Sequence, residues 1–253
     1  MKIVLSPAKS LDFERQLPTK KCSEYSFTKQ TLIIENVLKK QKPNQLMELM
    51  SISNKLADLN WKRNQERNVA QMTIDNARQA VFAFSGEVYI GLDAYSLSDE
   101  KIDVLQDKLR ILSGLYGILK PLDLIQSYRL EMGTKIAIGK NKNLYEFWKP
   151  IIAKQLNAEL EKEELFVNLA SNEYFEAVDL KQLKVSVITP EFKDYKDGKL
   201  KMISFFAKKA RGMMVRFIID SNAETVDDLK GFNYGGYWYD ANLSSGNKLV
   251  FTR

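Results

Sequence analysis

A group of cations near the end of the chain is the feature of the sequence that bears most directly on chemistry. The segment 205–219 has the spacing of an amphipathic helix, with one apolar and one cationic side. Its cationic side is formed by Lys208, Lys209, Arg211 and Arg216. Like charges this close repel each other, and an anionic partner would relieve the repulsion. Gly212 costs about 1 kcal/mol relative to alanine inside a helix, which favours close approach by another chain or a ligand. We therefore expect an anion site here, against the alternative of a solvated helix.

A second group of polar residues follows two expected strands. Lys9 lies in the loop after the apolar run 2–5, and Ser171, Glu173 and Tyr174 follow the run 165–169. Loops after the strands of α/β proteins commonly meet at a ligand site. These side chains could form a pocket in which a carboxylate acts as acid or base. The alternative is that Ser171 and Glu173 only cap a helix and that Lys9 is a solvated lysine.

The stretch 112–133 combines apolar residues with glycines, a proline and charges. Gly114 and Gly117 permit a tight turn, and Lys120 and Arg129 add cations. One interpretation is a helix-hairpin-helix whose backbone N–H groups hold phosphates. The other is a buried strand at 110–115 that turns into a short helix after Pro121. The pattern alone leaves both open.

Composition excludes several classes of site. The 253 residues include no histidine and only one cysteine, Cys22. Catalysis by a Ser-His-Asp or Cys-His group, zinc sites of the usual His/Cys kind and an internal disulfide are therefore impossible within this chain. The net charge of +6 is a moderate bias toward anionic partners. We expect neither a cofactor nor a bound metal.

Expected strands and helices alternate early in the chain, and hairpins dominate late. A helical block covers about 28–80, and two hairpins are expected over 184–204 and 237–253. This order predicts a single domain over 1–253, an α/β fold with a mixed sheet, surrounding helices and α+β character at the C-terminal hairpins. No apolar run is long enough for a membrane span, and the first residues do not form a signal peptide, so we expect a cytoplasmic protein.

Several short motifs, spread from the first residues to the final third of the chain, resemble those of the YaaA family of bacterial peroxide stress resistance proteins. They are SPAKSL at 6–11, FSGEVYIGL at 84–92, LSGLYG at 112–117, PLD at 121–123, YRLEMG at 128–133, NLASNEY at 168–174 and KKARG at 208–212.

The resemblance implies a cytosolic, DNA-binding protein that protects against hydrogen peroxide by limiting unincorporated iron. It also implies one compact domain with a positively charged cleft and a helix-hairpin-helix at 114–117. Matching positions suggest five cleft cations and two tyrosines as base-stacking or polar partners: Lys9, Arg129, Lys208, Lys209 and Arg211, with Tyr89 and Tyr116. The expected partner is the DNA phosphate backbone, read with little sequence specificity by a monomer without membrane contact. The alternative is an enzyme that acts on a nucleobase or nucleotide, as in deazaguanine-type base modification. Without histidine a direct iron store is disfavoured, so any effect on iron is expected to be indirect.

Overall fold

A mixed sheet of eight strands lies at the centre of the computed structural model, which describes residues 1–253. Five neighbouring strands run parallel, and antiparallel strands complete the sheet at both edges and beside β9. In spatial order the strands are β11 (Trp238–Tyr239), β12 (Lys248–Thr252), β9 (Val187–Lys196), β8 (Phe166–Leu169), β1 (Lys2–Leu5), β5 (Leu109–Ser113) and β6 (Gly117–Leu119), with β10 (Lys199–Lys201) paired to β9. The mixed sheet, the strand at 2–5 and both late hairpins confirm the prediction from sequence.

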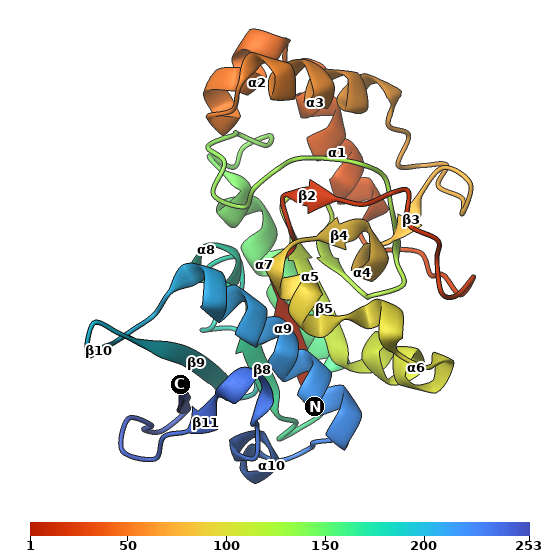
Figure 1. The fold of residues 1–253 in the computed structure, drawn as a ribbon. Helices are drawn as coiled ribbons and strands as arrows, with labels where there is room; N and C mark the ends of the chain where they lie inside the picture. Colours follow the sequence, from red (N-terminus) through yellow and green to blue (C-terminus); the bar gives the residue numbers. More distant parts are fainter.

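The chain also forms ten α-helices (Figure 1). They are α1 (Thr28–Lys39), α2 (Pro43–Met50), α3 (Asn54–Glu66), α4 (Ala80–Ala83), α5 (Glu87–Leu92), α6 (Asp99–Lys108), α7 (Leu144–Glu159), α8 (Asn172–Phe175), α9 (Ser204–Ser221) and α10 (Val226–Lys230). Helices α1 to α3 form the expected helical block, at the top of Figure 1, and it ends earlier than predicted, at Glu66. Two short strand pairs, β2 (Ser10–Leu11) with β4 (Phe84–Ser85) and β3 (Arg78–Gln79) with β7 (Leu124–Ile125), tie the connecting segments together.

The two faces of the sheet are covered by different helices. On one face, Phe192 of β9 stacks on Phe251 and packs edge-on against Phe232, which in turn contacts Phe217 of α9. On the other face, Phe166 of β8 packs against α8, and α7 is tied to β5. A single cluster of 61 buried apolar residues runs through both layers, so the chain forms one compact domain.

Helices α5 and α9 cross at two glycines. A Cβ atom on Gly212 of α9 would lie 1.8 Å from the carbonyl oxygen of Val88, and one on Gly91 of α5 would lie 2.1 Å from that of Lys209. Both distances are far below any van der Waals contact, so only glycine permits this crossing. The close approach expected at Gly212 is therefore made by another helix of the same chain.

The expectation of a helix-hairpin-helix at 114–117 was wrong. Residues 109–119 form a β-hairpin, in which β5 and β6 pair with Ser113 opposite Gly117. Gly114 and Gly117 are buried, and the Gly114 carbonyl accepts a hydrogen bond from the Trp148 indole at 2.9 Å. The turn takes Gly117 to φ 74°, with the Trp148 ring directly over it. Neither glycine can present its backbone to DNA. The buried strand of the alternative interpretation is confirmed as β5, but the short helix expected after Pro121 was wrong, because the chain there forms a turn and then β7.

Candidate anion-binding pocket

A pocket of about 280 Å³ opens where β1 and β8 end, which we call the basic pocket. These strands are parallel neighbours, so both end at the same edge of the sheet, where ligands of α/β proteins commonly bind. Its lining combines hydroxyl, carboxylate and cationic side chains: Ser6, Lys9, Ser10, Ser85, Glu87, Ser171, Glu173, Tyr174, Lys208 and Arg211. The two groups of residues singled out from the sequence thus meet in one place.

The floor of the basic pocket is a network of serine hydroxyls. The backbone N–H of Ser171 donates to Ser6 Oγ at 2.8 Å, and the Ser6 hydroxyl lies 3.3 Å from that of Ser171. Tyr89 locks the same loop, because its hydroxyl donates to the Ser6 carbonyl at 3.1 Å. Ser171 precedes α8 without a side-chain capping bond, so its hydroxyl faces Ser6 and the pocket rather than the helix.

Glu173 and Tyr174 form the wall beside these hydroxyls. Glu173 Oε1 accepts the backbone N–H of Gly133 at 3.1 Å, and the Tyr145 hydroxyl donates to the Glu173 carbonyl at 3.0 Å. These bonds hold the carboxylate at the pocket while leaving its second oxygen available. Burial raises the pKa of Tyr174 far above its usual range, so its phenol stays protonated.

Two cations of α9 face the pocket without a partner of their own. Lys208 and Arg211 are three residues apart, which places them on one side of the helix. Neither side chain makes a hydrogen bond or ion pair within the chain, and Glu191 acts on Arg211 only from beyond ion-pair distance. Burial lowers the pKa of Arg211, yet a guanidinium stays charged at any physiological pH. The pocket therefore holds one half-buried cation, Arg211, and one exposed cation, Lys208, neither of which forms an ion pair within the chain.

The other predicted cations are placed differently. Lys9 reaches Glu131 at 2.6 Å, and Arg129 reaches the same carboxylate at 3.1 Å, so these two cations are already paired beside the pocket. Lys209 is exposed but does not line the pocket, because it lies about 100° round the helix from Lys208. Lys120 lies beside Asp123, away from the pocket lining.

Arg216 is committed to the fold. Its guanidinium donates to Asp220 at 2.8 Å, to the Ser96 hydroxyl at 2.6 Å and to the Asp93 carbonyl at 3.2 Å. It lies about two helical turns beyond Lys208. On the cationic side of α9, Lys208 and Arg211 are therefore unpaired and line the pocket, whereas Arg216 is bound to other parts of the fold.

The tyrosines suggested as stacking partners lie in the core. Tyr89 and Tyr116 are both buried, and the Tyr116 ring packs edge-on against Tyr25 and Tyr128. Burial raises the pKa of both phenols well above the usual value. The Tyr116 ring is enclosed by these neighbours, whereas Tyr89, although buried, lines a second pocket next to the basic pocket. Sequence reasoning instead missed Ser6 as a pocket residue, although a hydroxyl directly after a buried strand was a usable signal.

Two further properties of the structure bear on the type of site. No three or more histidine, cysteine, aspartate or glutamate side chains come together in an arrangement suited to a metal ion. None of the helices combines the length and apolar character that crossing a membrane requires.

Comparison with known proteins finds similarity over nearly the whole chain. A family model described as peroxide stress protein YaaA matches residues 1–243. The chain is 71% identical to a UPF0246 protein of Flavobacterium johnsoniae and 64% identical to one of Flavobacterium psychrophilum, over 253 residues and 100% of both chains in each case. A UPF0246 protein of Hahella chejuensis is 49% identical over 255 residues, which cover 100% of this chain and 99% of the relative.

Proposed function

Because the chain belongs to the peroxide stress protein YaaA family, with its role in the peroxide stress response, we propose that it acts there as a cytoplasmic DNA-binding protein. A phosphate of the DNA backbone would lie in the basic pocket. The observation that carries this proposal is the unpartnered pair Lys208 and Arg211. Buried charges in proteins are normally paired, since desolvation of a lone charge is costly. An arriving phosphate supplies the missing partner.

The other groups of the pocket suit a phosphate as well. A phosphate oxygen accepts hydrogen bonds, and the hydroxyls of Ser6 and Ser171 can donate at the pocket floor. Arg211 presents a planar fork that matches two phosphate oxygens, while Lys208 acts as a point charge at the rim. None of these groups reads a base edge, so this contact binds without sequence preference.

Equilibrium binding of a fluorescent DNA duplex tests this proposal. We expect the double variant Lys208→Ala/Arg211→Ala to bind at least tenfold more weakly, because two charge-assisted contacts of about 1.5–3 kcal/mol each are lost. Lys154→Ala is the matched control: it removes an exposed, unpaired lysine from α7, on the other face of the sheet, and should bind like the parent. Equal affinity of the double variant and the control would overturn the assignment.

A second candidate function, an enzyme that acts on a nucleobase or nucleotide, is favoured by the convergence of Ser171, Glu173 and Tyr174 with the two cations in one pocket. Glu173 would act as the acid or base. Mass spectrometry of nucleotides and DNA after incubation with the protein would detect a product. Glu173→Gln should abolish it while keeping the bond from Gly133, and Glu176→Gln, at the exposed residue directly after α8, is the control. Equal product from both variants would contradict the role of Glu173.

We also propose that any effect on unincorporated iron is indirect. A chain without histidine has only carboxylates and one exposed cysteine to offer a ferrous ion. Calorimetric titration of the purified protein with ferrous iron under anaerobic conditions should show no tight binding. A dissociation constant in the micromolar range or below would overturn this view.

A further inference from the structure

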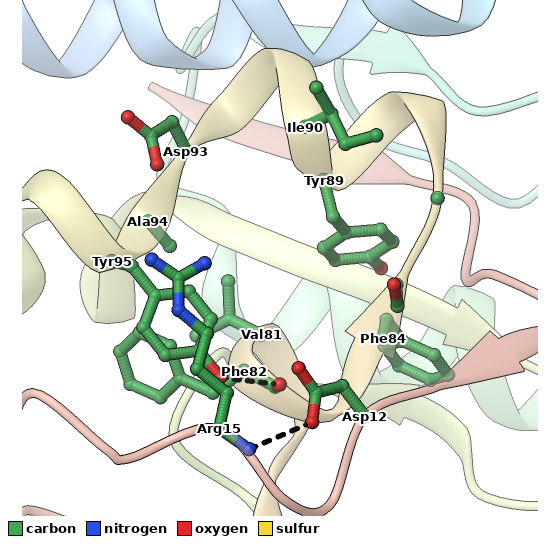
Figure 2. Close-up of a pocket in the computed structure, with 12 residues that line it drawn as sticks. Asp12, Arg15, Val81, Phe82, Phe84, Tyr89, Ile90, Asp93, Ala94 and Tyr95 are labelled. Carbon is green, nitrogen blue, oxygen red and sulfur yellow. Dashed lines mark hydrogen bonds between the residues drawn. The ribbon is translucent and has the colours of Figure 1, made fainter.

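A second pocket, of about 380 Å³, lies directly beside the basic pocket, and we call it the Arg15 pocket. The two pockets share Ser85 and Gly86 as a common wall. Figure 2 shows the Arg15 side chain lying along the ring of Tyr95, with the carboxylates of Asp12 and Asp93 on either side. Nothing described so far uses this pocket.

The Arg15 guanidinium stacks on an aromatic ring instead of forming an ion pair. It lies 3.8 Å from the centre of the Tyr95 ring and pairs with no carboxylate. Tyr95 is fixed in turn, because its hydroxyl donates to the Phe82 carbonyl at 3.1 Å and accepts from Arg78 at 2.8 Å. A guanidinium plane fixed in this way is a platform on which a nucleobase can stack.

The charges of the Arg15 pocket select against a phosphate. Asp12 accepts the backbone N–H groups of Glu14 and Arg15 at 2.9 and 3.0 Å, and these bonds lower the pKa of its carboxyl group. With Asp93, two carboxylates and one guanidinium line the pocket, and Arg216, outside this lining, lies 3.9 Å from the Asp93 carboxylate. Ionised carboxylates only accept hydrogen bonds, so they suit the amino and ring N–H groups of a base. In the basic pocket next to it, cations outnumber carboxylates: Lys9, Lys208 and Arg211 line it with Glu87 and Glu173, and Lys208 and Arg211 form no ion pair.

Half of the wall between the pockets, at Gly86, lacks a side chain. Gly86 adopts φ 154° and ψ −179°, a conformation essentially confined to glycine. A Cβ atom there would meet only the Cβ atom of Ala8, at 3.5 Å. At this position glycine therefore adds no side chain to the boundary between the two pockets, which a ligand that occupies both would have to cross.

We propose that the Arg15 pocket binds the base of a nucleotide whose phosphate lies in the basic pocket, an inference that rests on the proposed phosphate site. In DNA, that nucleotide would be unstacked, either in a single strand or displaced from a duplex. The protein would then favour single-stranded or locally opened DNA over intact duplex.

Calorimetric titration with dAMP, dGMP and 2-deoxyribose 5-phosphate tests the proposal. These probes carry the same phosphate, and only the first two carry a base. We expect the nucleotides to bind roughly tenfold or more tightly than the sugar phosphate, in line with stacking contributions per base in other proteins. If all three bind equally, the base site is overturned while the phosphate site stands. If none binds, the proposed phosphate site fails as well.

Variants of Arg15 separate stacking from charge. Arg15→Ala should lower the affinity for dGMP to that for 2-deoxyribose 5-phosphate, and it should leave the affinity for the sugar phosphate unchanged. Arg15→Lys keeps the charge but loses the plane, so it should behave like Arg15→Ala. Lys20→Ala, which removes an exposed and unpaired lysine nearby, is the control. Binding of dGMP by Arg15→Ala or by Arg15→Lys at the parental affinity would overturn the stacking role. The Arg15 side chain is exposed, so all of these variants should fold.

Discussion

The crossing of α5 and α9 allows a sharp prediction for Gly212→Ala. In an unobstructed helix this substitution would stabilise the protein by about 1 kcal/mol. Here the new Cβ would lie 1.8 Å from the Val88 carbonyl oxygen and 2.7 Å from the backbone nitrogen of Leu92. These are backbone atoms, which cannot turn aside as a flexible side chain would, so the two helices have to separate.

The expected loss follows from two opposing terms. Overpacking a tight contact costs about 1–3 kcal/mol, and a backbone clash lies at the upper end. Subtracting the gain in helix propensity of about 1 kcal/mol leaves a net loss of about 2 kcal/mol. For a protein of this size, that loss lowers the melting temperature by roughly 4–8 °C. Because α9 also carries Lys208 and Arg211, DNA affinity should fall with stability.

Urea unfolding followed by circular dichroism measures the loss. Gly91→Ala should give a similar value, because its Cβ would lie 2.1 Å from the Lys209 carbonyl oxygen in the same crossing. The double variant should lose less than the sum, since helices once separated accommodate both methyl groups. As a control, Gly246→Ala meets nothing within 4 Å and should cost only the strain of its left-handed conformation, about 1 kcal/mol. A Gly212→Ala protein as stable as the parent would refute the packing argument.

Two further predictions concern single carboxylates. Burial raises the pKa of the Asp123 carboxyl group from its ordinary value to about 6, so the folded protein binds a proton more tightly than the unfolded chain. This stabilisation is complete below pH 4 and is lost as pH rises to 6. Urea unfolding should show that the free energy of unfolding of the parent falls by on the order of 3 kcal/mol relative to that of Asp123→Asn over this range. A difference in unfolding free energy that does not change with pH would contradict the raised pKa. Glu131 pairs with both Lys9 and Arg129 beside the basic pocket. Glu131→Gln should release both cations and tighten DNA binding severalfold at low salt in fluorescence anisotropy, whereas weaker binding would show that the carboxylate positions them.

The sequence predicted much of the architecture because local signals and burial patterns agree there. The hairpin of β9 and β10, the Thr225 cap of α10 and the buried strand β8 all follow from local chemistry. The segment 109–119 was harder, because its glycines suit a β-turn as well as a helical hairpin. What decides between them is the distant pairing of β5 with β1 and the Trp148 ring over Gly117, which local spacing does not encode.

In the candidate site, too, local sequence signals predicted one part and distant contacts decided the rest. The helical wheel placed four cations together, yet only Lys208 and Arg211 face the pocket. Arg216 is taken up by Ser96 and Asp220, one of which belongs to a segment more than a hundred residues away. Lone cations are recognised only once their possible partners are placed, so the fold had to be known first.

The central claim is that two unpartnered cations of α9 hold DNA phosphate. Its most direct test is the slope of log K against log salt concentration for a short duplex, measured for the parent and for Lys208→Ala/Arg211→Ala. Each phosphate contact contributes about −0.9 to that slope, so we expect the variant to be shallower by about 2. Parallel lines for the two proteins would show that the phosphates are held elsewhere and would contradict the account.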